Sequence, residues 1–134
     1  MSSPFKAYDI RGELPTQINA AFAYRLGLAV AALRQPDSVV VGHDMRQDSA
    51  GLAGALAQGL LDGGVDVLPV GMCGTEEVYF HTAASGAGAG LMVTASHNPD
   101  SYNGFKMVLE GAAAATRENA LNAIEELVMS DRPL

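Results

Sequence analysis

Three short apolar runs, each bounded by glycine, constrain the fold more than any other feature of the sequence. They lie at residues 39–42, 65–71 and 90–94. Such nearly continuous runs are typical of strands that are buried on both faces of a sheet. Strands of this kind, when helices separate them, imply right-handed crossovers and a mainly parallel sheet.

Helical patterns occupy the segments between these runs. One helix is expected to begin at Thr16 and to extend to about Arg34. A second begins at Asp48 or Ser49 and ends at a pair of glycines, and a third begins at Thr75.

A fourth strand is expected at residues 104–110. Only residues 95–103 separate it from the third strand, which is fewer than the dozen or so that a parallel return needs, so the pair should be antiparallel. A last helix, capped by Thr116, follows. We therefore expect residues 1–134 to form a single α/β domain, a three-layer α/β/α sandwich with a mixed, mainly parallel four-stranded sheet.

The composition excludes several classes of function. The chain has 134 residues, is 49% hydrophobic and can bury a core. Eight basic against 15 acidic residues give a net charge of −7, which argues against binding to nucleic acid or to an anionic membrane surface. No apolar run approaches the roughly 20 residues of a membrane span, and one cysteine suits a reducing compartment. We expect a cytoplasmic protein.

Polar loops follow each of the first three expected strands. They lie at residues 42–44, 71–75 and 95–98. Ligands of open α/β sheets bind at the carboxyl ends of the parallel strands. These three loops should therefore converge at one edge of the sheet, and the third of them carries Ser96 and His97 side by side.

A Ser–His hydrolase pair does not fit this loop. Neighbouring residues of an extended segment point to opposite sides, so His97 is poorly placed to take a proton from Ser96. No Gly-x-Ser-x-Gly sequence surrounds the serine. The glycine-rich residues 86–90 precede a strand instead of opening a helix, so they do not form a nucleotide-binding loop.

Phosphoryl chemistry fits the same loop better. Ala95 leaves room for a phosphate to approach the backbone, and His97 and Lys106 offer positive charge. An antiparallel fourth strand would bring Lys106 back near the loop, as a phosphate neighbour or a general acid/base. From the residues alone, an ordinary Asn–Pro turn with a surface lysine remains the alternative.

The sequence of this loop resembles the phosphoserine loop of the α-D-phosphohexomutases, the phosphomannomutases and phosphoglucomutases. The resemblance rests on the segments TASHNP (94–99) and YNGFK (102–106). Three further segments resemble other motifs of that family: FKAYDIRG (5–12), GHDMR (42–46) and GMCGTEE (71–77). The last of these segments is most similar to the phosphomannomutase branch of the family.

The resemblance implies that Ser96 carries the transferable phosphate. Its phosphoserine would convert a hexose 1-phosphate to a hexose 6-phosphate through a hexose 1,6-bisphosphate, which is both activator and intermediate. Lys106 and His97 match family positions that act near the reacting oxygens. A Mg²⁺ ion would bind Ser96 through its phosphate.

The resemblance also implies that Tyr8, Arg11 and Asn98 contribute to catalysis or to substrate and phosphate binding. Arg11 could hold a phosphate through its planar guanidinium. A structural ion pair of Arg11 with Asp9, Asp44 or another acid is the alternative. We interpret Asp44 and Arg46 as mostly structural.

The family enzymes have four domains, and the sequence resembles only the first. The expected Mg²⁺ ligands, an Asp-Gly-Asp-Gly-Asp-like loop, do not occur in this chain. The missing C-terminal domains are therefore expected partners, without which the domain should lack full turnover and could self-associate. A non-catalytic, stand-alone sugar-phosphate-binding module is the alternative function. The last five residues resemble an interdomain linker, which favours a fragment over a split subunit or a natural truncation.

Overall fold

Five strands of the described residues, 3–134, form one mixed sheet in this computed structural model. The strands are β1 (Ile10–Glu13), β2 (Ser38–His43), β3 (Asp66–Met72), β4 (Ala89–Val93) and β5 (Tyr102–Leu109). Their order across the sheet is β1-β5-β4-β2-β3. β2 pairs in parallel with β3 and β4, whereas β5 pairs antiparallel with β4 and β1.

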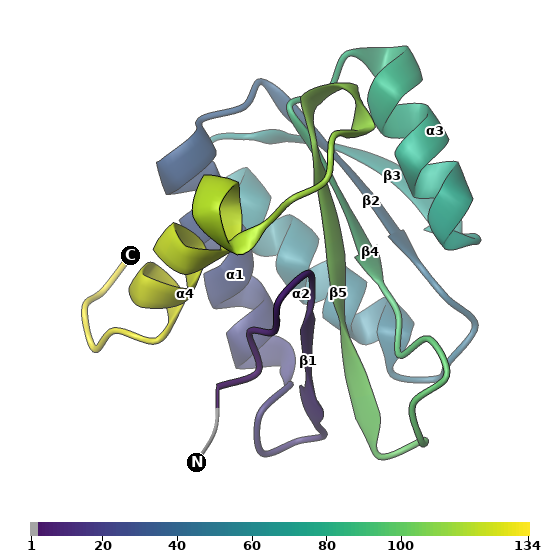
Figure 1. The fold of residues 1–134 in the computed structure, drawn as a ribbon, viewed down its shortest axis with the longest axis vertical. Coiled ribbons are helices and arrows are strands. Elements are labelled where there is room, and N and C mark those ends of the chain that lie inside the picture. Colours follow the sequence, from purple (N-terminus) through teal and green to yellow (C-terminus); the bar gives the residue numbers. More distant parts are fainter. Residues whose placement is uncertain (1–2) are drawn as a thin grey trace.

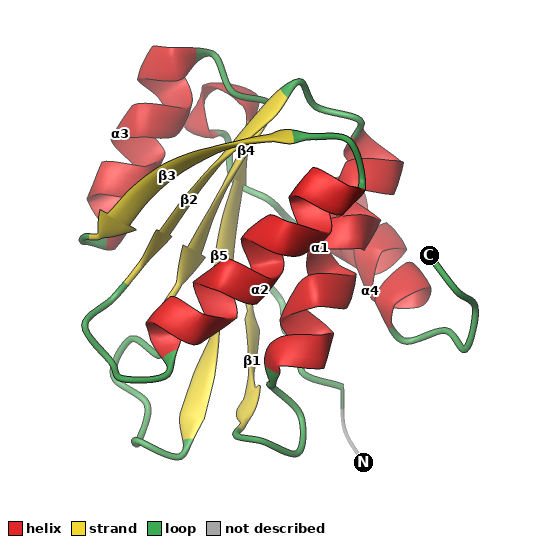
Figure 2. Cartoon of the chain, turned by 180° about the vertical axis from the view of Figure 1, so that it is seen from behind, coloured by secondary structure: helices red, strands yellow, loops and turns green. Residues whose placement is uncertain are grey.

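Helices cover both faces of this sheet (Figures 1 and 2). The helices α1 (Ala20–Arg34), α2 (Ser49–Asp62) and α4 (Asn122–Val128) lie on one face, and α3 (Thr75–Ser85) lies on the other. The predicted three-layer α/β/α architecture with a mixed sheet is confirmed. Among residues 3–134, no helix has both the length and the apolar character that a membrane crossing requires.

The predicted count of four strands is wrong, because β1 was missed. This strand has four residues and buries only Ile10 and Gly12, so its sequence has no run of apolar residues and too little alternation to be recognised. It forms because β5 offers a free edge, on which Ile10 pairs with Phe105 and Arg11 with Gly104.

The burial predicted for the second apolar run is also wrong. β3 pairs only with β2, at the end of the sheet, and all of its residues are exposed or half-buried. Pro69 lies within it, and proline is confined to edge strands because it cannot donate to the hydrogen-bond ladder. β4, in contrast, is buried along its whole length.

Two predicted helix starts differ in detail from the structure. The helix expected from Thr16 begins at Ala20, where the side chain of Asn19 accepts a hydrogen bond from the amide of Phe22 at 2.8 Å. Thr116 caps a π-helical turn, Arg117–Leu121, which continues into α4.

Arg25 of α1 fixes the end of α4. Its guanidinium donates to the carbonyl oxygens of Leu127, Val128, Ser130 and Arg132 at 2.6–3.1 Å. The last carbonyl groups of a helix have no partner within the helix, so Arg25 supplies donors at the end of α4 and to the residues that follow it.

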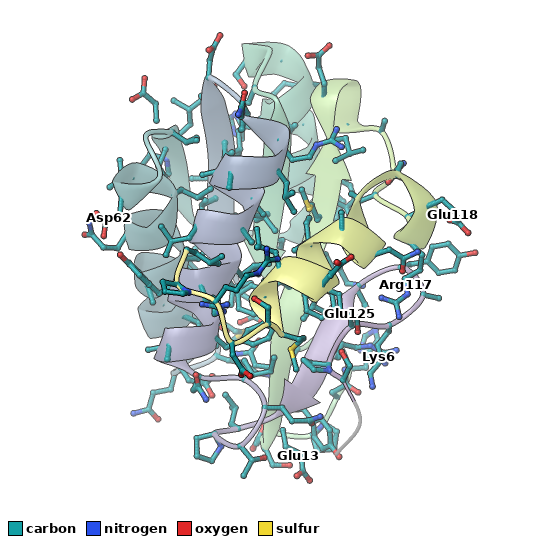
Figure 3. The ribbon with its side chains drawn as sticks, turned by 90° about the vertical axis from the view of Figure 1, so that its left-hand side faces the viewer. Lys6, Glu13, Asp62, Arg117, Glu118 and Glu125 are labelled. Atoms are coloured by element: carbon teal, nitrogen blue, oxygen red, sulfur yellow. The ribbon has the colours of Figure 1, made fainter. Side chains whose placement is uncertain are left out.

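The N-terminal segment is tied to the same helix on another side. Glu125 forms an ion pair with Arg117 at 2.8 Å and accepts a hydrogen bond from the hydroxyl of Ser3 at 2.5 Å. Figure 3 shows Arg117 and Glu125 together, beside the segment that carries Lys6. These contacts hold the start of the chain, and so the approach to β1, against the α4 layer.

The helices α1 and α2 approach each other closely at two glycines. A Cβ atom at Gly59 would lie 2.1 Å from the carbonyl oxygen of Tyr24, and one at Gly27 would lie 2.4 Å from that of Leu56. Both clashes are with backbone atoms, which cannot move without separating the helices. The absence of side chains at these positions therefore sets how closely α1 and α2 pack.

Gly59→Ala should lower the free energy of unfolding by about 1–3 kcal/mol, because the added methyl group overpacks the contact between α1 and α2. Gly54→Ala is the matched control, since a Cβ atom at Gly54 of the same helix meets no atom within 4 Å. The control should raise stability by about 0.5–1 kcal/mol, because alanine favours the helix. Urea denaturation of both variants tests this, and equal effects would contradict the packing account.

Candidate functional site

Ser96 lies on the exposed loop that connects β4 to β5. Its φ angle is +53°, in the left-handed region that residues with a side chain rarely adopt. Such a conformation costs on the order of 1–3 kcal/mol and persists only where the surroundings enforce it. One enforcing contact is local, because the amide of Ser96 donates to the hydroxyl oxygen of Thr94 at 3.0 Å.

Asn98 closes the turn that follows the serine. Its backbone amide and its side-chain amide both donate to the carbonyl oxygen of Ala95, at 2.9 and 2.8 Å. The amide of Tyr102 then donates to the carbonyl oxygen of Pro99 at 2.9 Å, which leads the chain into β5. Asn98 thus uses one of its side-chain donors to shape the loop.

Asp44, just after β2, accepts hydrogen bonds from two segments. One carboxylate oxygen accepts from the hydroxyl of Ser49 at 2.5 Å and from the amide of Arg46 at 3.1 Å. The other accepts from the amide of Ala95 at 3.2 Å. Partial burial alone would raise the pKa of Asp44, but these bonds and one from the Thr94 hydroxyl outweigh it and hold the pKa below its ordinary value.

Arg46 reaches across to the far side of the same loop. Its guanidinium donates to the carbonyl oxygens of Pro99 at 2.8 Å and Tyr102 at 3.4 Å, and also to that of Asn98. The carboxylate of Asp100 lies 3.8 Å from the same guanidinium. The loop of Ser96 is therefore held by the segment that follows β2.

Asn103 joins these two segments at the start of β5. Its buried side-chain amide donates to the carboxylate of Asp48 at 3.1 Å and to the hydroxyl of Ser49 at 3.0 Å. Its side-chain oxygen accepts from the amide of Gly104 at 2.8 Å. This buried contact connects the N-terminus of α2 to the return of the loop.

Two cations and one carboxylate lie together on the α3 face of the sheet. Asp9 bridges the Nε atom of Arg11 at 3.0 Å and the Nζ atom of Lys106 at 3.4 Å. Asp9 is largely buried, whereas the Arg11 and Lys106 side chains are partly exposed. Arg11 therefore forms the ion pair with Asp9 that was the alternative to phosphate binding. Two cations and one carboxylate leave the cluster with one net positive charge.

Tyr8 lines a pocket next to this cluster. The pocket has a volume of about 270 Å³, and Lys106 and Tyr79 of α3 also line it. Tyr8 is 75% exposed. Burial, together with the nearby carboxylates of Asp9 and Glu76, raises the pKa of Tyr79, so its hydroxyl is protonated at neutral pH.

Of the predicted site residues, the structure brings Arg11 and Lys106 together at Asp9, and Tyr8 and Lys106 line one pocket. Within residues 3–134, no hydrogen bond or ion pair joins these side chains to the loop of Ser96. Lys106, on β5, pairs in register with Met92, four residues before Ser96. Its ion pair is with Asp9 rather than with the serine loop. Ser96 and His97 are adjacent and exposed on that loop.

Two features of the site were missed by sequence reasoning. The sequence predicts Asp9 only as a structural partner of Arg11, whereas in the structure Asp9 also binds Lys106. For Arg46 the sequence predicts a mostly structural role but not its contacts with the loop, because the acceptors are backbone carbonyl groups more than fifty residues away.

The side chains of residues 3–134 do not form a metal centre of their own. No group of three or more His, Cys, Asp or Glu side chains in this part of the chain is arranged to hold a metal ion. Mg²⁺ usually needs carboxylate oxygens and water in near-octahedral geometry. The donor set described here does not supply them.

Sequence comparison identifies relatives across almost the whole chain. The family described as phosphoglucomutase/phosphomannomutase, alpha/beta/alpha domain I, matches residues 2–133. A phosphomannomutase from Klebsiella pneumoniae is 50% identical over 92% of this chain and 78% of that relative. A phosphomannomutase from Escherichia coli is 50% identical over 92% of this chain, but over only 27% of its own length. The chain thus spans about a quarter of that second relative.

Solved structures give the same result. A phosphoglucomutase/phosphomannomutase family protein from Burkholderia thailandensis superposes with a TM-score of 0.77 and 36% sequence identity, covering 93% of this chain and 29% of that one. A candidate phosphomannomutase from Thermus thermophilus superposes with a TM-score of 0.85 and 32% identity, covering 96% and 30%.

Asp44→Asn should make the free energy of unfolding less dependent on pH in acid. Because the pKa of Asp44 is lower in the folded protein, its stabilisation is present above the ordinary value of about 3.9 and is lost as the pH falls through the folded value. The variant should therefore be destabilised most at neutral pH, and the difference from wild type should shrink below about pH 4.

Urea denaturation at a series of pH values measures this difference. Asp37→Asn, which changes an exposed carboxylate outside this network, is the control. A gap between wild type and Asp44→Asn that stays constant across the acid range would contradict the account.

Proposed function

The chain belongs to the phosphoglucomutase/phosphomannomutase family, as its α/β/α domain I, and from this we propose that it supplies Ser96 as the phosphate-carrying residue of a hexose-phosphate mutase. The proposal rests on one observation: Ser96 is exposed and adopts a left-handed conformation in the loop that follows the fully buried strand β4. Strained residues of this kind are common where a reactive side chain is presented.

The proposed reaction consists of two phosphoryl transfers, one from phosphorylated Ser96 to the sugar and one from the sugar back to Ser96. The bond between phosphorus and Oγ of phosphorylated Ser96 breaks, and a bond from phosphorus to a hydroxyl oxygen of a hexose 1-phosphate forms. The hydroxyl gives up its proton to a base, and Oγ of Ser96 receives one from an acid. In the second transfer, Oγ of Ser96 gives its proton to a base and bonds to the phosphorus of the other phosphate of the hexose 1,6-bisphosphate. The bond from that phosphorus to the oxygen on C1 breaks and this oxygen receives a proton from an acid, which leaves the hexose 6-phosphate and restores phosphorylated Ser96.

Lys106 and Arg11 are the proposed electrostatic partners of this transfer. Both stand beside Asp9 on the α3 face, and phosphoryl transfer depends on positive charge around the equatorial oxygens. Lys106 is also the proposed acid/base, because Asp9 orients its ammonium group. His97 would add charge from the loop itself.

Tyr8 and Asn98 are proposed to act in binding. Tyr8 lines the pocket next to Lys106 and presents an exposed aromatic face with a hydroxyl, which suits a sugar. Asn98 keeps one side-chain N–H beyond its bond to Ala95, and this donor is available for a phosphate oxygen.

A Mg²⁺ ion that binds the phosphate of Ser96 would need ligands from outside this chain, because the described residues offer no cluster for it. The metal would neutralise charge on the transferred phosphate. The roles of Lys106, Arg11 and Asp9 derived above do not depend on it.

The remaining domains of a longer enzyme are the proposed partners, and hexose phosphates are the proposed substrates. Large apolar side chains are exposed, among them Met45 after β2, Met72 at the end of β3 and Phe80 of α3, at 67–82% exposure. Such side chains suit an interface with further domains or with a second copy of the isolated domain. The names of the relatives favour mannose phosphate as the substrate.

Intact-mass measurement after incubation with glucose 1,6-bisphosphate and Mg²⁺ tests the proposal. The wild-type chain should gain one phosphoryl group, and Ser96→Ala should gain none. Ser101→Ala, in the same exposed loop, is the matched control and should be phosphorylated like wild type. Lys106→Met should slow the transfer by about 10²–10⁴-fold, the usual contribution of a general acid/base.

Phosphorylation of Ser96→Ala at the wild-type rate would rule out this function. If calorimetry showed binding of the hexose phosphate but no variant gained mass, the result would favour the alternative, a non-catalytic sugar-phosphate-binding module.

A further inference from the structure

The loop of Ser96 reverses the direction of the chain between two adjacent strands. The chain leaves β4 at Val93 and returns as β5 at Tyr102, so residues 94–101 reverse its direction. Ser96 adopts a left-handed conformation within this reversal. Within the loop, the carbonyl oxygen of Pro99 accepts from the amide of Tyr102, but few of the other carbonyl groups have a backbone donor there, so further donors must come from elsewhere.

Arg46 provides these donors. It is the one side chain among the described residues that donates hydrogen bonds to the carbonyl oxygens of Asn98, Pro99 and Tyr102. The guanidinium is planar, always charged and rigid, so it fixes the relative positions of all the acceptors it binds. The Arg46 side chain is only 22% exposed, which shields these bonds from competing water.

Arg46 is itself held by a group that binds the first half of the loop. Its backbone amide donates to Asp44, and the same carboxylate accepts from the amide of Ala95 and from the hydroxyl of Thr94. Thr94 in turn accepts from the amide of Ser96. Asp44 and Arg46, just after β2, therefore bind the loop both before and after Ser96.

We propose that Arg46 is a positioning residue that holds Ser96 in its left-handed conformation and so presents the hydroxyl for phosphoryl transfer. Arg46 acts through the loop backbone and not through contact with the reacting atoms. The hold on the loop follows from the geometry alone, whereas its consequence for phosphoryl transfer rests on the function proposed above.

Without Arg46, the carbonyl groups of Asn98, Pro99 and Tyr102 lose their shared donor. The second half of the loop can then move, and Ser96 can relax toward a conformation that costs less. Oγ would spend less time in line with an incoming phosphate, and misplacement by about 1 Å can cost on the order of 10²-fold in rate.

The test compares Arg46→Ala and Arg46→Lys with Arg25→Ala. Arg25 is a matched control because its guanidinium also donates to several backbone carbonyl groups, but at the end of α4. The loop after β4 and the end of α4 lie on different sides of the molecule in Figures 1 and 2. Both substitutions to alanine remove comparable bonds, so both should reduce overall stability.

Amide hydrogen exchange, resolved by residue, is the first readout. In Arg46→Ala, the amides of Ala95, Ser96, Asn98 and Tyr102 should exchange at least about tenfold faster than in wild type, because the loop loses the hydrogen bonds that hold it closed. Arg46→Lys should restore part of the protection. Arg25→Ala should leave these four amides unchanged relative to amides of the core.

The rate of phosphorylation of Ser96 by glucose 1,6-bisphosphate is the second readout. It should fall about 10–100-fold in Arg46→Ala, recover in part in Arg46→Lys, and stay near wild type in Arg25→Ala. The half-saturating donor concentration should change little in all three variants, because a positioning residue acts through the loop backbone and not through the donor.

Two results would overturn the inference. One is wild-type exchange of the loop amides in Arg46→Ala. The other is an equal acceleration of loop exchange in Arg25→Ala, which would show a general loss of stability. A wild-type chain that takes up no phosphate would count against the proposed function instead, and the exchange data would still decide whether Arg46 holds the loop.

Discussion

The antiparallel return of β5 beside β4 is the constraint on which the rest of the candidate site depends. A parallel neighbour would need a long crossover, whereas this return uses only residues 94–101. It places Lys106 opposite Met92 and leaves the outer edge of β5 free for β1. β1 then brings Arg11, with Asp9 just before it, to the same face as Lys106. One strand pairing thus brings Arg11, Asp9 and Lys106 together on one face of the sheet.

Sequence reasoning recovered the parts of the fold that bury continuous apolar surface. β2 and β4 are such strands, and the antiparallel direction of β5 followed from the short connection before it. β1 was not predicted because it has one large apolar residue, Ile10, and this residue is recognisable as part of a strand only from its pairing with Phe105. β3 is a strand as predicted, but Pro69 within it indicates an edge position and not the buried one expected from its apolar run.

For the candidate site, sequence reasoning located the loop but not its support. Ser96 could be singled out because turn-forming residues and a family resemblance both mark it. Arg46 could not, since its acceptors are carbonyl groups, which every residue has, and their arrangement exists only in the folded chain. Asp9 was visible as a neighbour of Arg11 in the sequence, but its bridge to Lys106 depends on the pairing of β1 with β5.

The central claim is that Ser96 and the Arg11–Asp9–Lys106 cluster form one site. The most direct test is nuclear magnetic resonance of the chain with phosphoserine incorporated at position 96 during synthesis, compared with the unmodified chain. The account predicts that the side-chain nitrogen resonances of Lys106 and Arg11 shift on phosphorylation, while that of Arg25 stays unchanged. Shifts confined to the residues of the loop itself would contradict it, because the cluster would then lie beyond the reach of the phosphate.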